Sequence, residues 1–335
     1  MGFFSQPKVV VLKESSNAKE YLKQLEELRT KASGEAAKQI DKEIAITKAG
    51  IIGEDNILFE LKNSGMDMVV LHDLYFERTS GMSAQIDFLV LTPKLNFVIE
   101  CKNLFGDIEI TNKGEFIRTV EYGGRKYKEG IYSPITQNQR HLQVIKECRT
   151  GNQEGLIRLL KNYGFEAFFR GLIVFANPKT IVNDRWAKKE VKNQVIRADQ
   201  LIETIKRMNK ESKDFPFSSK ELLQDGQRYL AMNREYHTDY IEKFREMIQN
   251  QSDVPDDLKN TESSLIEEEN DVQPEKTLMR SEGDRQESEQ EQKKICPRCG
   301  KELVLREAKR GTHVGEKFYG CSSYPKCRYI EKCEA

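Results

Sequence analysis

Two strand-like stretches decide the fold of the core: Gln85-Ile86-Asp87-Phe88-Leu89-Val90-Leu91 and Asn96-Phe97-Val98-Ile99-Glu100-Cys101-Lys102. Both are rich in aliphatic and aromatic residues, and the intervening Thr92-Pro93-Lys94-Leu95 is typical of a hairpin turn. We therefore expect the two stretches to pair as antiparallel strands. If Asp87 pairs with Lys102 and Leu89 with Glu100, one face of the hairpin is wholly apolar, because it carries Ile86, Phe88, Val90, Phe97, Ile99 and Cys101.

The same pairing brings Asp87, Glu100 and Lys102 together on the opposite face. Asp87 then lies diagonal to Glu100, at a separation of about 7–8 Å that a bridging cation can span. Carboxylates at the end of an apolar sheet are costly unless a cation neutralises them. We expect Mg2+ (or Mn2+) on Asp87, Glu100 and the carbonyl of Cys101, with Lys102 orienting or deprotonating water, which indicates phosphodiester hydrolysis. An exposed salt bridge is the ordinary explanation of a Glu-x-Lys triplet alone.

Two predicted helices bring further polar groups. Gly53 is expected to open a helix in which Glu54 shares an inward face with Ile57, Leu58 and Leu61, although Glu54 could instead cap the helix dipole. Ser133-Pro134 predicts another helix start, after which Gln137 and His141 share one face. Both could contact substrate, or Gln137 could cap a strand. For His141 we favour a structural or surface role.

Four motifs occur in order between about residues 48 and 170. They resemble the nuclease-related domain (NERD), a family related to the PD-(D/E)xK restriction-endonuclease-like nucleases. The resemblance implies an α/β, restriction-endonuclease-like core, with Glu54, Asp87, Glu100 and Lys102 as the metal-binding and catalytic set and Gln137 as an accessory residue. The motifs are Gly50-Ile51-Ile52-Gly53-Glu54, Gln85-Ile86-Asp87, Ile99-Glu100-Cys101-Lys102-Asn103 and Ser133-Pro134-Ile135-Thr136-Gln137-Asn138-Gln139.

Five of the seven cysteines crowd into the last forty residues, which does not fit a secreted disulfide framework. Cys296-Pro-Arg-Cys299 and Cys321-Ser-Ser-Tyr-Pro-Lys-Cys327 form two pairs. Four thiolates in two such turns are typical of a tetrahedral structural Zn2+ site, which can hold a segment too small to build a core. Cys333 is left as a spare thiol.

The same segment resembles the C-terminal C4 zinc fingers of type IA DNA topoisomerases, which implies DNA binding, often to single strands. Basic and aromatic residues alternate there, as suits base stacking over a phosphate track. Some of the aromatic residues must instead pack the small zinc ribbon. The residues expected to contact DNA are Arg306, Lys309, Arg310, Lys317, Tyr319, Tyr324, Lys326 and Arg328.

The 335 residues carry equal numbers of acidic and basic side chains, but these are segregated along the chain. Residues 249–294 hold 14 acids and 6 bases, and residues 250–294 lack aromatic residues, so we expect a disordered tether. The predicted organisation is a helical N-terminal region (1–49), a nuclease-like domain (50–180), a mainly helical extension (181–249), an acidic disordered linker (250–294) and a C4 zinc ribbon (295–335).

These patterns favour a metal-dependent DNA nuclease or DNA-processing protein whose zinc finger holds DNA. The principal alternative is a non-catalytic DNA-binding or scaffold protein, and a third makes the ribbon a protein-interaction module. Because no apolar run approaches the length of a membrane span, we expect a cytoplasmic protein. The two family resemblances imply a bacterial, nucleoid-associated one. DNA, in single-stranded form among others, is the expected partner, and a homo-oligomer or a helicase or repair partner is left open.

Overall fold

The computed structural model describes residues 8–78, 81–151, 164–235, 240–252, 296–297, 301–307, 317–322 and 330–332. The chain divides into two compact units, Met1–Met279 and Arg280–Ala335, and each is described by itself. Apart from residues 250–252, the expected disordered linker lies outside the described residues. No described helix is long and apolar enough to cross a lipid bilayer.

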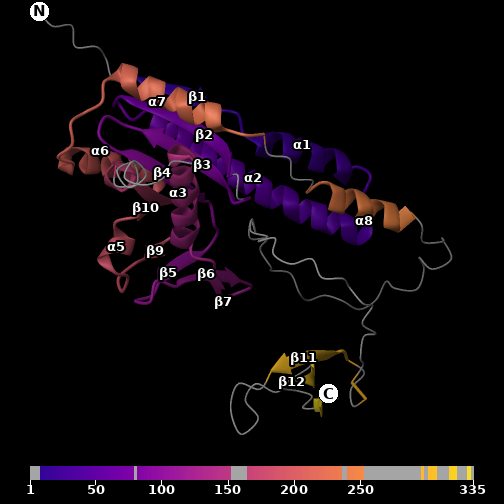
Figure 1. The fold of residues 1–335 in the computed structure, drawn as a ribbon. Helices are drawn as coiled ribbons and strands as arrows, with labels where there is room; N and C mark the ends of the chain where they lie inside the picture. The colour runs from indigo at the N-terminus through magenta and orange to yellow at the C-terminus, as the bar shows by residue number, and fades with distance from the viewer. Residues whose placement is uncertain are drawn as a thin grey trace, which may run out of the picture. The chain divides into compact units, whose positions relative to one another are not determined.

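A six-stranded mixed sheet forms the centre of the larger unit (Figure 1). Strands β2, β3 and β4 pair antiparallel, so the expected hairpin is confirmed as β3 and β4. Parallel pairs β1–β2, β4–β8 and β8–β10 complete the sheet, and the mixed α/β class is therefore confirmed. In spatial order the strands are β1 (Val9–Lys13), β2 (Met68–Glu77), β3 (Ser83–Leu91), β4 (Asn96–Lys102), β8 (Phe169–Phe175) and β10 (Val195–Arg197).

Helices cover both faces of this sheet, because both faces are apolar. On one face, α2 (Gly34–Lys62) and α6 (Leu201–Glu211) pack over Phe88, Val90, Phe97 and Ile99. On the other, α3 (Pro134–Thr150) and α7 (Ser219–Met232) pack over Leu89, Leu91 and Val98. A short 3-10 helix, η1 (Ala198–Gln200), leads into α6, and α5 (Lys189–Lys192) precedes β10.

The register of β3 and β4 differs by two residues from the expected one. Phe88 pairs with Ile99 and Leu91 with Asn96, so Asp87 does not lie opposite Lys102. A shift of two preserves the side-chain alternation, and the predicted faces are confirmed for the ladder between Phe88 and Leu91. The expected pairing is wrong by two residues because the turn is shorter than expected and spans only residues 92–95. Side-chain alternation alone does not determine the length of this turn.

Ile86 was assigned to the wrong face, because the alternation breaks beside it. Ile86 and Leu89 pack in the same α3/α7 core although they are three residues apart, and Leu71 and Leu74 in β2 do the same. Between the latter pair, Asp73 has a φ of 53°, a left-handed conformation that non-glycine residues seldom adopt. Asp87 lies at the corresponding break in β3.

In the N-terminal region expected to be helical, α1 (Asn17–Arg29) packs against the first half of α2, and α8 (Glu242–Ser252) packs against them through Phe244. However, α2 runs unbroken to Lys62 and crosses the boundary expected at residue 49. Gly53 is therefore inside a helix and does not begin one, so Glu54 cannot cap the dipole at a helix start.

A second, four-stranded sheet packs beside the central sheet through Ile108, Phe116 and Phe175. Its strands, in spatial order, are β7 (Arg125–Ile131), β6 (Phe116–Tyr122), β5 (Asp107–Ile110) and β9 (Val182–Asn183). The smaller unit contains a three-stranded antiparallel sheet formed by β11 (Leu303–Glu307), β12 (Lys317–Cys321) and β13 (Ile330–Lys332).

Candidate functional site

Glu100 and Lys102 lie at the C-terminal end of β4, where the strand leaves the core. Glu100 Oε1 and Lys102 Nζ form an ion pair at 3.0 Å, and the Glu100 side chain is only 3% exposed. Lys102 Nζ also donates a hydrogen bond to Gln137 Oε1 at 3.0 Å. The side chains of Glu100 and Lys102 therefore face α3, as the alternation of β4 predicts, and the structure brings Glu100, Lys102 and Gln137 together.

Asp87 reaches this group through the backbone of β4. Its Oδ2 accepts a hydrogen bond of 2.8 Å from the N–H of Cys101, the residue between Glu100 and Lys102. The contact continues the pairing of the two strands beyond the ladder, which ends at Phe88 and Ile99. Asp87 is thus held against the backbone of β4 at the residue between Glu100 and Lys102.

His141, for which the sequence favours a structural or surface role, lies beside Glu100. Its Nδ1 lies 3.3 Å from Glu100 Oε2, and the residue is buried. Ser133 accepts the N–H of Thr136 and caps α3, with Pro134 in the first turn, so the predicted helix start is confirmed. Because Gln137 and His141 are four residues apart, one helix face presents both to the end of β4; that spacing was the signal for His141.

Asn138 fixes α3 against the sheet, and sequence reasoning missed it. Its Nδ2 donates to the carbonyl oxygens of Val98 (2.9 Å) and Leu172 (3.1 Å), so one amide bridges β4 and β8. A side chain at Gly171 would have its Cβ 3.0 Å from the same nitrogen, and only glycine leaves room for this approach. The amide in the quoted Thr136-Gln137-Asn138-Gln139 motif was the available signal.

Gly53 allows α2 to approach the end of β4 on the other face. A Cβ at Gly53 would lie 2.6 Å from the Cβ of Asn103 and 3.1 Å from the Sγ of Cys101. Asn103 Nδ2 donates to the carbonyl of Ala49 at 2.6 Å, which ties the strand end to the helix. The glycine expected at a helix start is needed instead for this close packing.

Glu54 contacts His72, and within the described residues it makes no hydrogen bond or ion pair with Asp87, Glu100, Lys102 or Gln137. Its Oε2 lies 3.0 Å from His72 Nε2, and the imidazole stacks on Phe88. His72 Nδ1 is 3.0 Å from the carbonyl oxygen of Glu14. Since a carbonyl only accepts, Nδ1 carries a proton, and a second proton must lie between Nε2 and Glu54.

The pair of Glu54 and His72 belongs to a buried polar network that includes residues of β1 and β2. Burial lowers the pKa of His72, but the hydrogen bond and charge of Glu54 outweigh it, and the pKa is raised from its ordinary value. Asp73 accepts from Gln85 Nε2 at 2.7 Å, and Lys13 Nζ donates to the Asp73 and His72 carbonyls. These contacts hold the backbone of Asp73 in its left-handed conformation.

The donor set near β4 suits a hard cation only in part. Within the described residues, no three His, Cys, Asp or Glu side chains group as metal ligands. However, Mg2+ commonly uses one or two carboxylates and keeps several waters. Glu100 Oε2 is buried and makes no hydrogen bond within the described residues, although it pairs with His141. A buried carboxylate oxygen of this kind is a ligand that Mg2+ prefers, and Asp87 is connected to the same strand end through the N–H of Cys101.

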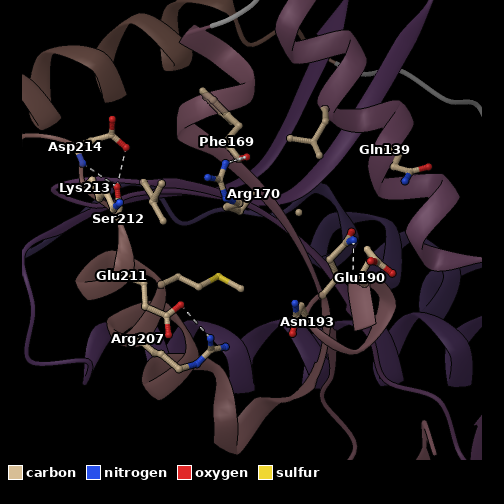
Figure 2. A pocket seen from close by; sticks show the side chains of 15 residues that line it. Gln139, Phe169, Arg170, Glu190, Asn193, Arg207, Glu211, Ser212, Lys213 and Asp214 are labelled. Atoms are coloured by element: carbon tan, nitrogen blue, oxygen red, sulfur yellow. Dashed lines mark hydrogen bonds and ion pairs between the residues drawn. The ribbon is translucent and has the colours of Figure 1, made fainter. Parts of the chain in front are cut away.

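A cavity of about 680 Å³ lies elsewhere in the larger unit (Figure 2). Its lining does not include Asp87, Glu100, Lys102, Gln137 or His141. Its polar lining is internally paired: Arg207 with Glu211, and Ser212 with Asp214. Arg170, also in its wall, donates to backbone carbonyls. We assign it no role in the site.

In the smaller unit, Cys296 and Cys321 are buried in one cluster with Leu303. The N–H of Cys296 donates to the carbonyl of Lys301 at 2.6 Å, which closes the turn before β11, and Cys321 ends β12 opposite Leu303. Two thiols brought together from separate turns fit half of a four-cysteine zinc site. Cys299 and Cys327 lie outside the described residues.

The expected DNA contacts of this unit are described only in part. Arg306 is exposed on β11, and Tyr319 on β12 is half-buried against the cysteine cluster. Lys317 begins β12. The other five predicted contacts lie outside the described residues: Lys309, Arg310, Tyr324, Lys326 and Arg328.

Comparison with known families gives one match in each of the two units. Residues 49–176 match the nuclease-related domain, and residues 293–335 match the topoisomerase DNA-binding C4 zinc finger. The C4 finger implies a structural zinc ion. No solved structure is significantly similar to the chain.

The similar curated proteins match the C-terminal segment alone. DNA topoisomerase 1 of Methanocaldococcus jannaschii is 49% identical over 41 residues, which cover 12% of this chain and 5% of the topoisomerase. That of Campylobacter jejuni is 53% identical over 47 residues, covering 12% and 6%. The uncharacterized protein YrdD of Escherichia coli is 51% identical over 35 residues, covering 10% and 17%. The chain thus carries a nuclease-related (NERD) domain followed by a topoisomerase-type C4 zinc finger.

Proposed function

We propose that the chain is a metal-dependent DNA phosphodiesterase with a restriction-endonuclease-like core, whose C4 zinc finger holds the substrate. The observation that carries the proposal is the convergence of Asp87, Glu100, Lys102, Gln137 and His141 where β3, β4 and α3 meet. The β3–β4 hairpin and a helix further along the chain contribute to it. A solitary surface salt bridge would need neither the buried Glu100 nor the amide of Gln137.

Asp87 and Glu100 would hold a divalent cation, Mg2+ or Mn2+, together with the carbonyl of Cys101. Such an ion supplies Lewis-acid polarisation of the phosphodiester and lowers the pKa of water. Lys102 is placed to donate to a phosphate oxygen as charge develops there, and Gln137 holds the Lys102 amine in position through their hydrogen bond. Glu100 contacts Lys102 through its Oε1 atom and His141 through its Oε2 atom.

Glu54 enters the proposal as a supporting residue. Its partner is His72, so its carboxylate braces the polar network under β2 and the packing of α2 on β4. The neighbouring Gly53 sets how closely that helix approaches Cys101. We therefore assign the direct chemistry to the residues at the end of β4.

The test is cleavage of labelled single-stranded, duplex and branched DNA by the purified chain with Mg2+ or Mn2+. Lys102→Ala and Asp87→Ala are expected to reduce the rate by about 10²–10³-fold, the cost of losing a group that stabilises transition-state charge. Lys62→Ala is the matched control, because Lys62 also pairs with a glutamate but lies on the exposed surface.

DNA affinity is measured on the same variants, so that a loss of cleavage is separated from a loss of binding. No cleavage with any metal, together with unchanged binding in Asp87→Ala and Lys102→Ala, would favour the scaffold alternative. For the zinc finger, unchanged single-stranded DNA binding in Cys296→Ala would favour a protein-interaction module.

A further inference from the structure

The β6–β7 hairpin, with the residue that follows it, carries an exposed aromatic and basic surface that the proposed catalytic group does not use. Gly123 and Gly124 form its turn with φ of 58° and 76°, which glycine adopts without strain. Strand β7 is the edge of its sheet, and five of its seven residues are exposed. We call residues 116–132 the tyrosine hairpin.

Three tyrosines of this segment are open to solvent: Tyr122 is 77% exposed, Tyr127 54% and Tyr132 42%. The register pairs Tyr122 with Arg125 and Val120 with Tyr127, so both hairpin tyrosines are on the same face of the ribbon and diagonal to each other. Diagonal neighbours are about 7–8 Å apart, close enough for two aromatic rings to act on one ligand.

Basic side chains lie on both faces of this hairpin. Arg125 shares the face of Tyr122 and Tyr127, whereas the exposed Lys126 and Lys128 lie on the opposite face of β7 because side chains alternate along a strand. The guanidinium of Arg140 lies 5.5 Å from the centre of the Tyr132 ring. The one carboxylate of β7, Glu129, is paired with Arg118 at 3.0 Å. Lys128 contacts Glu109 at 3.4 Å, an exposed pair that water weakens. The surface therefore offers cations beside open aromatic faces.

Lysines on an edge strand also discourage pairing with another strand, which is the ordinary reason for their presence. That explanation does not require tyrosines, because exposed rings increase the apolar surface in water. The combination of stacking surfaces with a track of cations is instead typical of sites that bind single-stranded nucleic acid without strong sequence preference.

We propose that the tyrosine hairpin, together with Arg140, binds single-stranded DNA. Bases stack on Tyr122 and Tyr127, Arg125 contacts a phosphate on the same face, and Lys126 and Lys128 contact phosphates where the DNA strand crosses the exposed edge of β7. Chain continuity connects this surface with the catalytic group: Tyr132 follows β7 directly, Ser133 caps α3, and Gln137 lies in the next helical turn. The choice of DNA as the ligand rests on the proposed function. It implies that the nuclease-like core acts on single-stranded DNA.

Photocrosslinking locates the bound strand independently of the zinc finger. The full chain with Lys102→Ala is irradiated with a 20-nucleotide oligothymidylate that contains 5-iodouracil, a length of about two ordinary single-strand sites. Crosslinked peptides are expected to contain Tyr122, Tyr127 or Tyr132. Crosslinks confined to residues 280–335 would overturn the inference. If crosslinks form at the hairpin and the wild type cleaves no DNA, the inference stands and the proposed catalysis fails.

Fluorescence anisotropy then measures the contribution of the rings. In a Cys296→Ala background, which removes the finger's contribution, the Tyr122→Ala/Tyr127→Ala double variant is expected to bind the oligothymidylate at least about tenfold more weakly, within the range of stacking losses. Tyr122→Phe/Tyr127→Phe keeps the rings and should keep the affinity. Phe215→Ala is the matched control, since Phe215 is an exposed ring in another loop.

Salt dependence tests the cations. Arg125→Ala/Lys126→Ala should reduce the slope of log affinity against log salt by about 1.4, or about 0.7 per lost phosphate contact on a single strand. Unchanged affinity in the tyrosine double variant, or an equal loss in Phe215→Ala, would overturn the proposal. So would loss of a dimer in the tyrosine double variant with DNA binding intact, because β7 would then be a protein-pairing edge.

Discussion

Replacing Gly53 with alanine tests the contact between α2 and β4 that supports the catalytic group. The new Cβ would lie 2.6 Å from Asn103 Cβ and 3.1 Å from Cys101 Sγ. Alanine favours a helix over glycine by about 1 kcal/mol, whereas overpacking a close contact costs about 1–3 kcal/mol. Asn103 Cβ is attached to the backbone and cannot swing aside, so the clash should win and destabilise the folded state by about 1 kcal/mol.

Gly50→Ala is the matched control, because Gly50 lies in the same helix and a Cβ there meets nothing within 4 Å. That variant should gain about 0.5–1 kcal/mol from helix propensity alone. Urea unfolding followed by far-ultraviolet circular dichroism measures both free energies of unfolding. If Gly53→Ala is as stable as Gly50→Ala, the close packing of α2 on β4 is refuted.

Three further changes test other parts of the account. Asn138→Ala removes two buried hydrogen bonds and should lower the free energy of unfolding by about 1–3 kcal/mol. Gln139→Ala, at the exposed neighbouring residue, should change the free energy of unfolding little. Equal effects of the two substitutions would contradict the anchoring role of Asn138. Burial raises the pKa of the Cys148 thiol despite the charge of Arg78, so at pH 8 iodoacetamide should alkylate it more slowly in the folded chain than in urea, as quantified by mass spectrometry; equal rates would be inconsistent with that burial. Cys296→Ala should release zinc to a colorimetric chelator, and retention of one zinc per chain would exclude Cys296 as a ligand.

The sequence predicted the parts of the fold that local patterns specify. The strands at residues 85–91 and 96–102, the N-cap at Ser133 and the N-terminal helical pair each follow from alternation, capping or helical spacing, and all are present. Alternation predicted that Glu100 and Lys102 share one face of β4, and helical spacing predicted that Gln137 and His141 share one face of α3. That Gln137 belongs with Glu100 and Lys102 was implied only by the family resemblance.

What the sequence did not predict depends on contacts between distant segments. The two-residue shift in register preserves alternation, so the pattern could not reveal it. Ile86 changed face because of a left-handed Asp73 in a neighbouring strand. The local sequence showed no sign of the close contact between Gly53 and Asn103, which lies fifty residues further along the chain. Gly53 was therefore interpreted as a helix start.

The roles of His141 and Asn138 were similarly hidden. A histidine on a helix face reads as structural until Glu100 is placed beside it. Asn138 reads as a polar residue until the carbonyls of β4 and β8 are seen to lie within its reach. For His141 the helical spacing from Gln137 was visible in the sequence, but the strand that it faces was not.

The central claim is that Asp87 and Glu100 together hold a divalent ion at the end of β4. Anomalous diffraction from crystals of the chain grown with Mn2+ tests this claim most directly. The account predicts a peak within about 2.0–2.3 Å of carboxylate oxygens from both residues, and its loss in Glu100→Gln. A well-ordered β3–β4 region with no peak beside either carboxylate, at Mn2+ concentrations that support DNA cleavage, would contradict it.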